Sequence, residues 1–293
     1  MAFESLQEIL DICIEEKKAF WQVVLEEDMN ERDVTAEESL GRMRHTWEAM
    51  LSAALSYEPD LRSKSGLVGG DGARMETFGK KYPDQMLCGA FGNRCMAVAL
   101  QMGESNACMK RIVAAPTAGS CGVLPAVLVP FYEERQRPVE QILEAMYVAA
   151  GIGQVIAHRA SISGAAGGCQ AEIGSASAMA AGALVHLQGG DAFQICQAVG
   201  MALKNLLGLV CDPVAGLVEV PCVKRNVIGT VNALSVADMV MAGIESRIPP
   251  DQVIDAMKEV GDKMDVSFRE TAMGGLAATP AGQEVSKKMA VKL

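Results

Sequence analysis

The residues of this chain with the clearest chemical potential are four cysteines beside Gly or Pro, namely Cys121, Cys169, Cys211 and Cys222. Cys211 and Cys222 close the segment CDPVAGLVEVPC, and Cys169 ends the glycine-rich segment GAAGGC. Thiols at turns are candidate metal ligands, but zinc usually draws its ligands from CxxC pairs, which this sequence lacks. An iron–sulfur cluster accepts widely spaced cysteines because its ligands surround a larger object. For Cys169, Cys211 and Cys222, spacing alone leaves both kinds of site open, with zinc the weaker candidate.

The other five cysteines are better explained as small buried apolar residues, because they lie among helical or apolar neighbours. They are Cys13, Cys88, Cys95, Cys108 and Cys196. Nine is an odd number of cysteines, and the chain is large for a disulfide-stabilised fold. We therefore expect free thiols, as in a reducing compartment.

The composition is that of a chain with a large aliphatic core. Half of the 293 residues are hydrophobic but only 4% are aromatic, so Ala, Val, Leu, Ile and 18 Met must fill the interior. The net charge of −10 argues against binding to nucleic acid or to an anionic membrane surface. No stretch approaches the ~20 apolar residues of a membrane span, and the acidic start lacks a signal-peptide pattern. We expect a cytoplasmic protein with no nucleic-acid or membrane partner.

Hydrophobic periodicity predicts an all-α single domain over residues 1–293, with long Gly-rich loops. Residues 1–58 are expected to form two amphipathic helices, with Thr35 and Glu38 in capping-box spacing, and residues 59–293 the body. Further helices are expected over 139–158, 170–187, 191–207, 227–244 and 250–264, and a short strand over 112–115 is compatible with the pattern. Residues 58–94, rich in Gly and Lys, indicate a long loop packed on the body, and such loops are often functional.

The segment over residues 160–184 is dominated by small residues, since 18 of its 25 residues are Ala, Gly or Ser. This composition is typical of a central helix squeezed between others. It is also compatible with a ligand site, because glycines just before a helix start can point backbone N–H groups at an anion.

Four blocks of the sequence resemble the signature segments of the iron–sulfur-dependent L-serine dehydratases, specifically their alpha subunit or alpha domain. The blocks are SKSGLVGGDG, APTAGSCGVLPAVL, SISGAAGGCQAEIGSASAMAAGAL and GLVCDPVAGLVEVPCVKRN. The resemblance implies that Cys169, Cys211 and Cys222 bind a [4Fe–4S] cluster through three irons, without pyridoxal phosphate. The remaining iron would polarise the hydroxyl of L-serine, and loss of water followed by hydrolysis would give pyruvate and ammonia. Cys121 stands where the family requires no cysteine, so we expect it to be a bystander.

The resemblance also indicates what this chain supplies and what it does not. The serine carboxylate needs hydrogen-bond donors and positive charge, for which the candidates are Lys64, Ser65, Thr117, Ser161 and Ser163. The family's Ser-Ser-Ser-His-Thr block, which belongs to the beta half and is thought to supply the base, is absent. A C-terminal cysteine that fills the fourth cluster position in some single-chain members is also absent. We therefore expect a separate beta subunit, with the catalytic base unassigned in this chain and His158 the first candidate if the chain acts alone.

Three alternatives remain open at the level of sequence. The same cluster could remove sulfide from L-cysteine or water from L-threonine, since a soft iron site accepts a thiol leaving group and one methyl group discriminates weakly. A pyridoxal-phosphate dehydratase could use Lys64 as its Schiff base. A non-enzymatic iron–sulfur sensor would bind the cluster without turnover.

Overall fold

The computed structural model describes residues 3–290, and within this range the expectation of an all-α fold is confirmed. The only β-type pairing among these residues is an isolated bridge between Cys211 and Arg269. The α-helices of the described range are α1 (Leu6–Glu16), α2 (Phe20–Arg32), α3 (Ala36–Leu55), α4 (Asp71–Lys81), α5 (Gly89–Ala107), α6 (Val123–Arg135), α7 (Val139–Arg159), α8 (Gly164–Gly167), α9 (Ser175–Leu187), α10 (Ala192–Lys204), α11 (Cys222–Met241), α12 (Pro250–Lys263) and α13 (Pro280–Ala290). Shorter turns are η1 (Pro83–Gln85), the π-helical η2 (Gln170–Gly174), η3 (Val214–Gly216), η4 (Val266–Phe268) and η5 (Gly275–Ala278).

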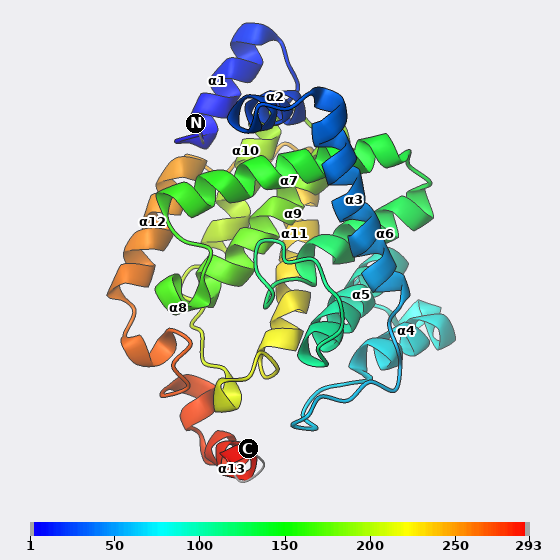
Figure 1. Cartoon of the computed structure of the whole chain (residues 1–293), viewed down its shortest axis with the longest axis vertical. Helices are drawn as coiled ribbons and strands as arrows, with labels where there is room; N and C mark the ends of the chain where they lie inside the picture. Colours follow the sequence, from blue (N-terminus) through cyan, green and yellow to red (C-terminus); the bar gives the residue numbers. More distant parts are fainter. Residues whose placement is uncertain (1–2, 291–293) are drawn as a thin grey trace.

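Helix α9 runs through the middle of the bundle (Figure 1), and α6, α7, α10 and α11 all pack against it. Every residue of α9 except His186 is buried. Its Ala, Gly and Ser side chains allow these neighbours to approach closely, so the small-residue segment is a central core helix. The short helix α8, in the glycine-rich segment before α9, lies on the side of α7 away from α1 and α2 (Figure 1).

The core has the expected aliphatic character. Val, Leu, Ile, Ala and Met supply most of the buried side chains, and the large buried aromatic residues are few, among them Phe20, Trp47 and Tyr147. Burial of a side chain of this size stabilises the fold by about 1.5–3 kcal/mol. None of the helices between residues 3 and 290 is both long and apolar enough to cross a membrane.

Three helices, not the expected two, form the N-terminal part of the chain. Lys17 and Asp33 end α1 and α2 in left-handed backbone conformations, with φ of 54° and 52°. Neither residue is Gly, so the sequence carries no obvious signal of these breaks. The predicted capping box is confirmed, because Thr35 N donates to Glu38 Oε2 at 2.9 Å while Glu38 N donates to Thr35 Oγ1 at 3.3 Å.

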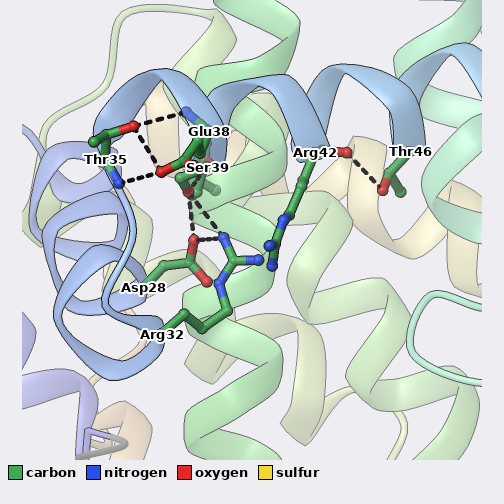
Figure 2. A network of polar contacts seen from close by, with 8 residues as sticks. Asp28, Arg32, Thr35, Glu38, Ser39, Arg42 and Thr46 are labelled. Carbon is green, nitrogen blue, oxygen red and sulfur yellow. Dashed lines mark hydrogen bonds and ion pairs between the residues drawn. The ribbon is translucent and has the colours of Figure 1, made fainter.

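A polar network anchors the N-terminal helices to α7. Figure 2 shows Asp28 accepting hydrogen bonds from Arg32 of the same helix and from Ser39 of α3. The Ser39 hydroxyl also lies 2.6 Å from the hydroxyl of the buried Tyr147 in α7. The hydrogen bonds of this network join α2, α3 and α7 and none of them reaches the cysteine segments, so we regard it as structural.

The prediction of a long loop over residues 58–94 is wrong in part, because α4, η1 and the start of α5 lie in this range. Gly70 takes a left-handed conformation before α4, and the buried Glu104 accepts from Asp71 N at 2.6 Å and from Gly72 N at 3.3 Å. The Glu104 carboxylate, distant in the sequence, thus accepts hydrogen bonds from backbone N–H groups in the first turn of α4. The local sequence could not reveal this pairing.

Other boundaries also differ from expectation. The strand compatible with 112–115 does not form, and these residues have no regular structure; no strand within the described chain is present to pair with them. Helix α11 begins at Cys222 rather than at residue 227, and α10 ends at Lys204 rather than at residue 207. Helix α6 was not expected after the proline-containing turn, yet it accommodates Pro130 in its interior.

Candidate metal centre

Three separate segments bring the thiols of Cys169, Cys211 and Cys222 together inside the protein. Cys169 immediately precedes η2, Cys211 lies in the segment after α10, and Cys222 is the first residue of α11. All three are buried. The side chains of Cys169 and Cys211 are in hydrogen-bonding contact, and each interacts electrostatically with Cys222. Residues far apart in sequence therefore form one thiol cluster.

The backbone of Cys211 is held on both sides by the segment after α12. Cys211 N donates to Phe268 O at 2.8 Å, and Glu270 N donates to Cys211 O at 2.8 Å. On its other face Cys211 meets Gly164, where an added Cβ would stand 3.0 Å from Cys211 Sγ and 3.4 Å from Glu270 Oε2. Glycine at position 164 thus allows the turn before α8 to approach the sulfur.

The first turn of α11 fixes Cys222 to the loop that precedes α6. Asn226 Nδ2 donates to Cys222 O at 3.0 Å and to Gly119 O at 2.8 Å, and Asn226 Oδ1 accepts from Gly122 N at 2.9 Å. Asn226 is buried. All these buried polar atoms are paired, so the relative position of the loop and of Cys222 is well defined.

The neighbouring Arg225 reaches the other two thiol segments. Its Nη1 donates to Val210 O at 2.7 Å and its Nη2 to Asp212 Oδ1 at 2.8 Å, on either side of Cys211. The guanidinium also makes a hydrogen-bonding contact with the side chain of Cys169. Arg225 lies on α11 with Cys222, and its side chain therefore contacts Cys169 and the residues that flank Cys211.

The pKa values of the three thiols shift in different directions. The hydrogen bond from Cys211 lowers the pKa of Cys169, and the positive charge of Arg225 contributes in the same direction. The same contact with Cys169, followed by burial, raises the pKa of Cys211. Burial raises the pKa of Cys222 to about 12, with the Cys169 charge adding to the effect. Binding of a metal group as thiolates would accordingly release protons.

The donor set consists of thiols, which are the usual ligands of iron–sulfur groups. Within residues 3–290, no three side chains of the types His, Cys, Asp and Glu converge closely enough to hold one metal ion. The three thiols are nonetheless grouped and buried, and they come from three separate segments. Three thiols from separate segments are of the ligand type that an iron–sulfur cluster takes, in which each sulfur meets a different iron.

A carboxyl group stands beside the thiols. Glu172 follows Cys169 by three residues and accepts a hydrogen bond from the Thr117 hydroxyl. A Cβ on Gly119 would lie 2.6 Å from Glu172 Oε1, so only glycine leaves room for this carboxyl. Burial raises the pKa of Glu172, the Thr117 hydrogen bond offsets part of the rise, and the charge of Glu270 adds to it. The raised pKa thus favours the protonated form of this carboxyl relative to a solvent-exposed glutamate.

Three of the five predicted substrate-binding residues lie next to this centre. Ser163 directly precedes Gly164, whose backbone faces Cys211. Ser161 Oγ accepts from Ser163 N at 3.0 Å within the same turn. Thr117 joins the centre through its hydrogen bond to Glu172.

The other two predicted residues lie in the segment before α4. Ser65 donates to Glu219 Oε2, which also accepts from Ser63 Oγ at 2.8 Å. Glu219 is buried and belongs to the segment between Cys211 and Cys222. The Lys64 side chain is exposed. Ser65 is thus connected to the centre through Glu219, whereas the structure brings Lys64 to none of the thiols.

The remaining cysteines behave only partly as expected. Cys13, Cys95 and Cys196 are buried, but Cys88 is exposed and Cys108 is half-buried. Cys88 and Cys108 cap the two ends of α5, where the chain meets solvent. Cys121 is buried, and its thiol contacts Met102 O at 3.8 Å.

None of the three histidines is among the groups that interact with the three thiols. His45 and His158 are exposed on α3 and α7. His186 is half-buried, with its Nε2 atom 3.1 Å from Glu144 Oε2. His158, the first candidate for the base if the chain acts alone, lies in the last turn of α7.

The sequence interpretation missed four polar residues that organise this centre: Arg225, Asn226, Glu172 and Glu219. The first two lie three and four residues after Cys222, which places them one turn along the same helix face. A helix start assigned at Cys222 would have revealed them. The partners of Glu219 are 156 and 154 residues away, so no local pattern could have shown that pairing.

Comparison with known proteins gives long matches. Residues 15–277 match the family described as serine dehydratase alpha chain. The chain is 44% identical over 290 residues to the "Probable L-serine dehydratase, alpha chain" of Bacillus subtilis (strain 168). This match covers 98% of this chain and 95% of that protein. It is 41% identical over 285 residues to the "L-serine dehydratase, alpha chain" of Peptoniphilus asaccharolyticus, with 97% of each chain covered. A shorter match, to "L-serine dehydratase 2" of Escherichia coli (strain K12), is 46% identical over 182 residues and covers 61% of this chain and 40% of that protein.

Proposed function

Because this chain belongs to the serine dehydratase alpha-chain family, we propose that it is the alpha chain of a [4Fe–4S]-dependent enzyme that converts L-serine to pyruvate and ammonia. The observation that carries the proposal is the burial of Cys169, Cys211 and Cys222 in one cluster drawn from three segments. Buried cysteines that serve only as small apolar residues need not meet one another.

Cys169, Cys211 and Cys222 are the residues that would hold the cluster. When bound through three thiolates, such a group supplies an open Lewis-acid position for the substrate hydroxyl. The buried position of the thiols keeps bulk water away and strengthens electrostatic interactions in the site. Glu172 and Thr117 provide a carboxyl and a hydroxyl at the edge of the same space.

The substrate carboxylate requires donors near the thiols, and the turn before α8 supplies them. No described residue pairs with the Ser163 hydroxyl, while its backbone N–H is occupied by Ser161. A free hydroxyl beside Gly164 and Cys211 is suited to the carboxylate of serine. Lys64 is exposed and is the weakest of the five proposed substrate-binding residues.

The proton acceptor for the Cα hydrogen is proposed to come from a beta chain. General-base catalysis needs a group within hydrogen-bond reach and with a pKa near the working pH, most often His. His45 and His158 are exposed and His186 is paired with Glu144. We therefore expect the isolated chain to bind a cluster but to make little pyruvate, and its beta chain to restore turnover. Full activity of the isolated chain would contradict this division of labour.

The deciding experiment is anaerobic reconstitution, followed by assays of iron, sulfide and pyruvate with and without the beta chain. Side-by-side turnover of L-serine, L-cysteine and L-threonine would separate a dehydratase for serine from a desulfidase or a threonine dehydratase. A pyridoxal absorbance without iron or sulfide would indicate a Lys64 Schiff-base enzyme instead. A bound cluster without pyruvate, even with the beta chain present, would indicate a sensor.

A further inference from the structure

We infer that Arg225 is the positioning residue that holds the three thiol-bearing segments in place and supplies positive charge to the metal group they bind. The inference rests on the proposed function, because it takes Cys169, Cys211 and Cys222 to be cluster ligands. It assigns a role to a residue that would touch the ligands rather than the substrate.

The first support is the pair of hydrogen bonds that bracket Cys211. Arg225 Nη1 donates to Val210 O at 2.7 Å and Arg225 Nη2 donates to Asp212 Oδ1 at 2.8 Å. These acceptors belong to the residues immediately before and after Cys211. The planar guanidinium fork can satisfy two fixed acceptors at once, which a lysine ammonium on a flexible stem does less well.

The second support is that the same guanidinium connects all three thiol segments. Arg225 lies in the first turn of α11, three residues after Cys222, and it makes a hydrogen-bonding contact with the side chain of Cys169. Residues that orient metal ligands from outside typically change metal affinity by about 10–100-fold when they are removed. Arg225 occupies such a position for the whole ligand set.

The third support is burial and charge. The Arg225 side chain is only 11% exposed and that of Asp212 only 5%. The second carboxylate oxygen of Asp212 accepts from Leu276 N at 2.8 Å, so the ion pair also links the thiol segment to η5. Thiolates would bring further negative charge into this space, beside Glu172. A fixed guanidinium compensates that charge, which a buried site needs.

The test uses the full-length chain reconstituted anaerobically as wild type, Arg225→Met, Arg225→Lys and the matched control Lys224→Met. Lys224 is the adjacent residue, but its side chain is 77% exposed, and its Nζ atom lies 3.6 Å from Asp71 Oδ2. Two quantities are measured: the rate at which a chelator removes iron, and the midpoint potential of the cluster. Circular dichroism first establishes that each variant keeps its helical content.

We expect Arg225→Met to lose iron about 10–100-fold faster than wild type and to have a more negative midpoint potential. Loss of a nearby positive charge makes addition of an electron less favourable. Arg225→Lys should keep a potential close to that of wild type, because the charge remains, but should lose iron faster, because one of the bracketing hydrogen bonds is lost. Lys224→Met should match wild type in both measurements.

Wild-type iron retention and potential in Arg225→Met would overturn the inference while leaving the proposed cluster intact. If Arg225→Met does not fold, Arg225→Lys decides, and unchanged iron retention in that variant would overturn the inference. Equal effects of Lys224→Met and Arg225→Met would overturn the inference, because they would show that loss of any positive charge on this helix turn is sufficient. A wild-type chain that takes up no iron and sulfide would overturn both the proposed function and this inference.

Discussion

The hydroxyl of Ser63 lies 2.8 Å from Oε2 of Glu219, and the two residues are 156 positions apart in the chain. Ser65 donates to the same carboxylate oxygen. Glu219 sits between Cys211 and Cys222, so the serine-containing segment before α4 is fastened to the segment that carries two of the thiols. The proposed substrate-binding segment and the proposed cluster-binding segment therefore form one unit.

Substitution Glu219→Ala should separate these two segments. Removing the acceptor leaves the Ser63 and Ser65 hydroxyls without their partner, which should cost about 1–3 kcal/mol of unfolding free energy. We expect a raised KM for L-serine with unchanged iron content, because Glu219 contacts neither Cys211 nor Cys222 in these hydrogen bonds. The measurements are chemical denaturation, steady-state kinetics with the beta chain and iron analysis. Glu219→Gln, which keeps an acceptor oxygen, should be affected less, and an unchanged KM in both variants would remove this segment from the site.

Substitution Ser163→Ala tests the proposed carboxylate contact. A hydrogen bond to a charged group contributes about 1.5–3 kcal/mol, so KM for L-serine should rise roughly 10–100-fold. Thermal stability should hardly change, because no described residue pairs with this hydroxyl. Ser235→Ala is a suitable control, since Ser235 is exposed on α11 and donates only to Asn232 O at 3.0 Å. Equal KM values for wild type and Ser163→Ala would exclude the contact.

Buried thiols away from the site make the protein sensitive to high pH. Burial, with a contribution from the Glu134 charge, raises the pKa of Cys95 from 9.0 to about 12. The unfolded chain loses this proton near its ordinary pKa while the folded chain retains it. The stabilisation is therefore complete below about pH 9 and is lost as the pH rises toward about 12, by at most about 1.4 kcal/mol per pH unit.

Substitution Cys95→Ala should accordingly flatten the decline of stability at alkaline pH. The measurement is the free energy of unfolding at about pH 8 and about pH 10. Cys88→Ala is the control, because Cys88 is exposed and should leave the slope unchanged. A decline as steep in Cys95→Ala as in wild type would show that this thiol does not contribute.

The elements that could be predicted from sequence are those with local signals. The capping box of Thr35 and Glu38 starts α3 as expected, and the small-residue segment became the central α9 with its glycine-rich turn beside Cys169. Both features depend on residues close in sequence. The predicted start of α11 at residue 227 was wrong because Pro221 and the preceding valines resemble a loop, whereas the helix begins directly after that proline.

The polar organisation of the centre could not be predicted, for a physical reason. The partners of Arg225 flank a cysteine on another segment, and Asn226 binds the loop that contains Gly119. Glu104 supports the first turn of α4 from within α5. Such contacts depend on packing of distant segments, and an isolated acidic or basic residue looks like any surface charge in the sequence. The thiols, with their neighbouring Gly and Pro residues, stood out in the sequence, whereas these polar partners did not.

The most direct test of the central claim is the iron and sulfide content of Cys211→Ser after anaerobic reconstitution, compared with Cys196→Ser. Both cysteines are buried, but Cys211 contacts Cys169 whereas the thiol of Cys196 faces Leu6 O at 3.9 Å. We predict that Cys211→Ser loses the cluster and its visible absorbance, as Cys169→Ser and Cys222→Ser should, while Cys196→Ser and Cys13→Ser keep both. A full complement of iron and sulfide in Cys211→Ser would contradict the account.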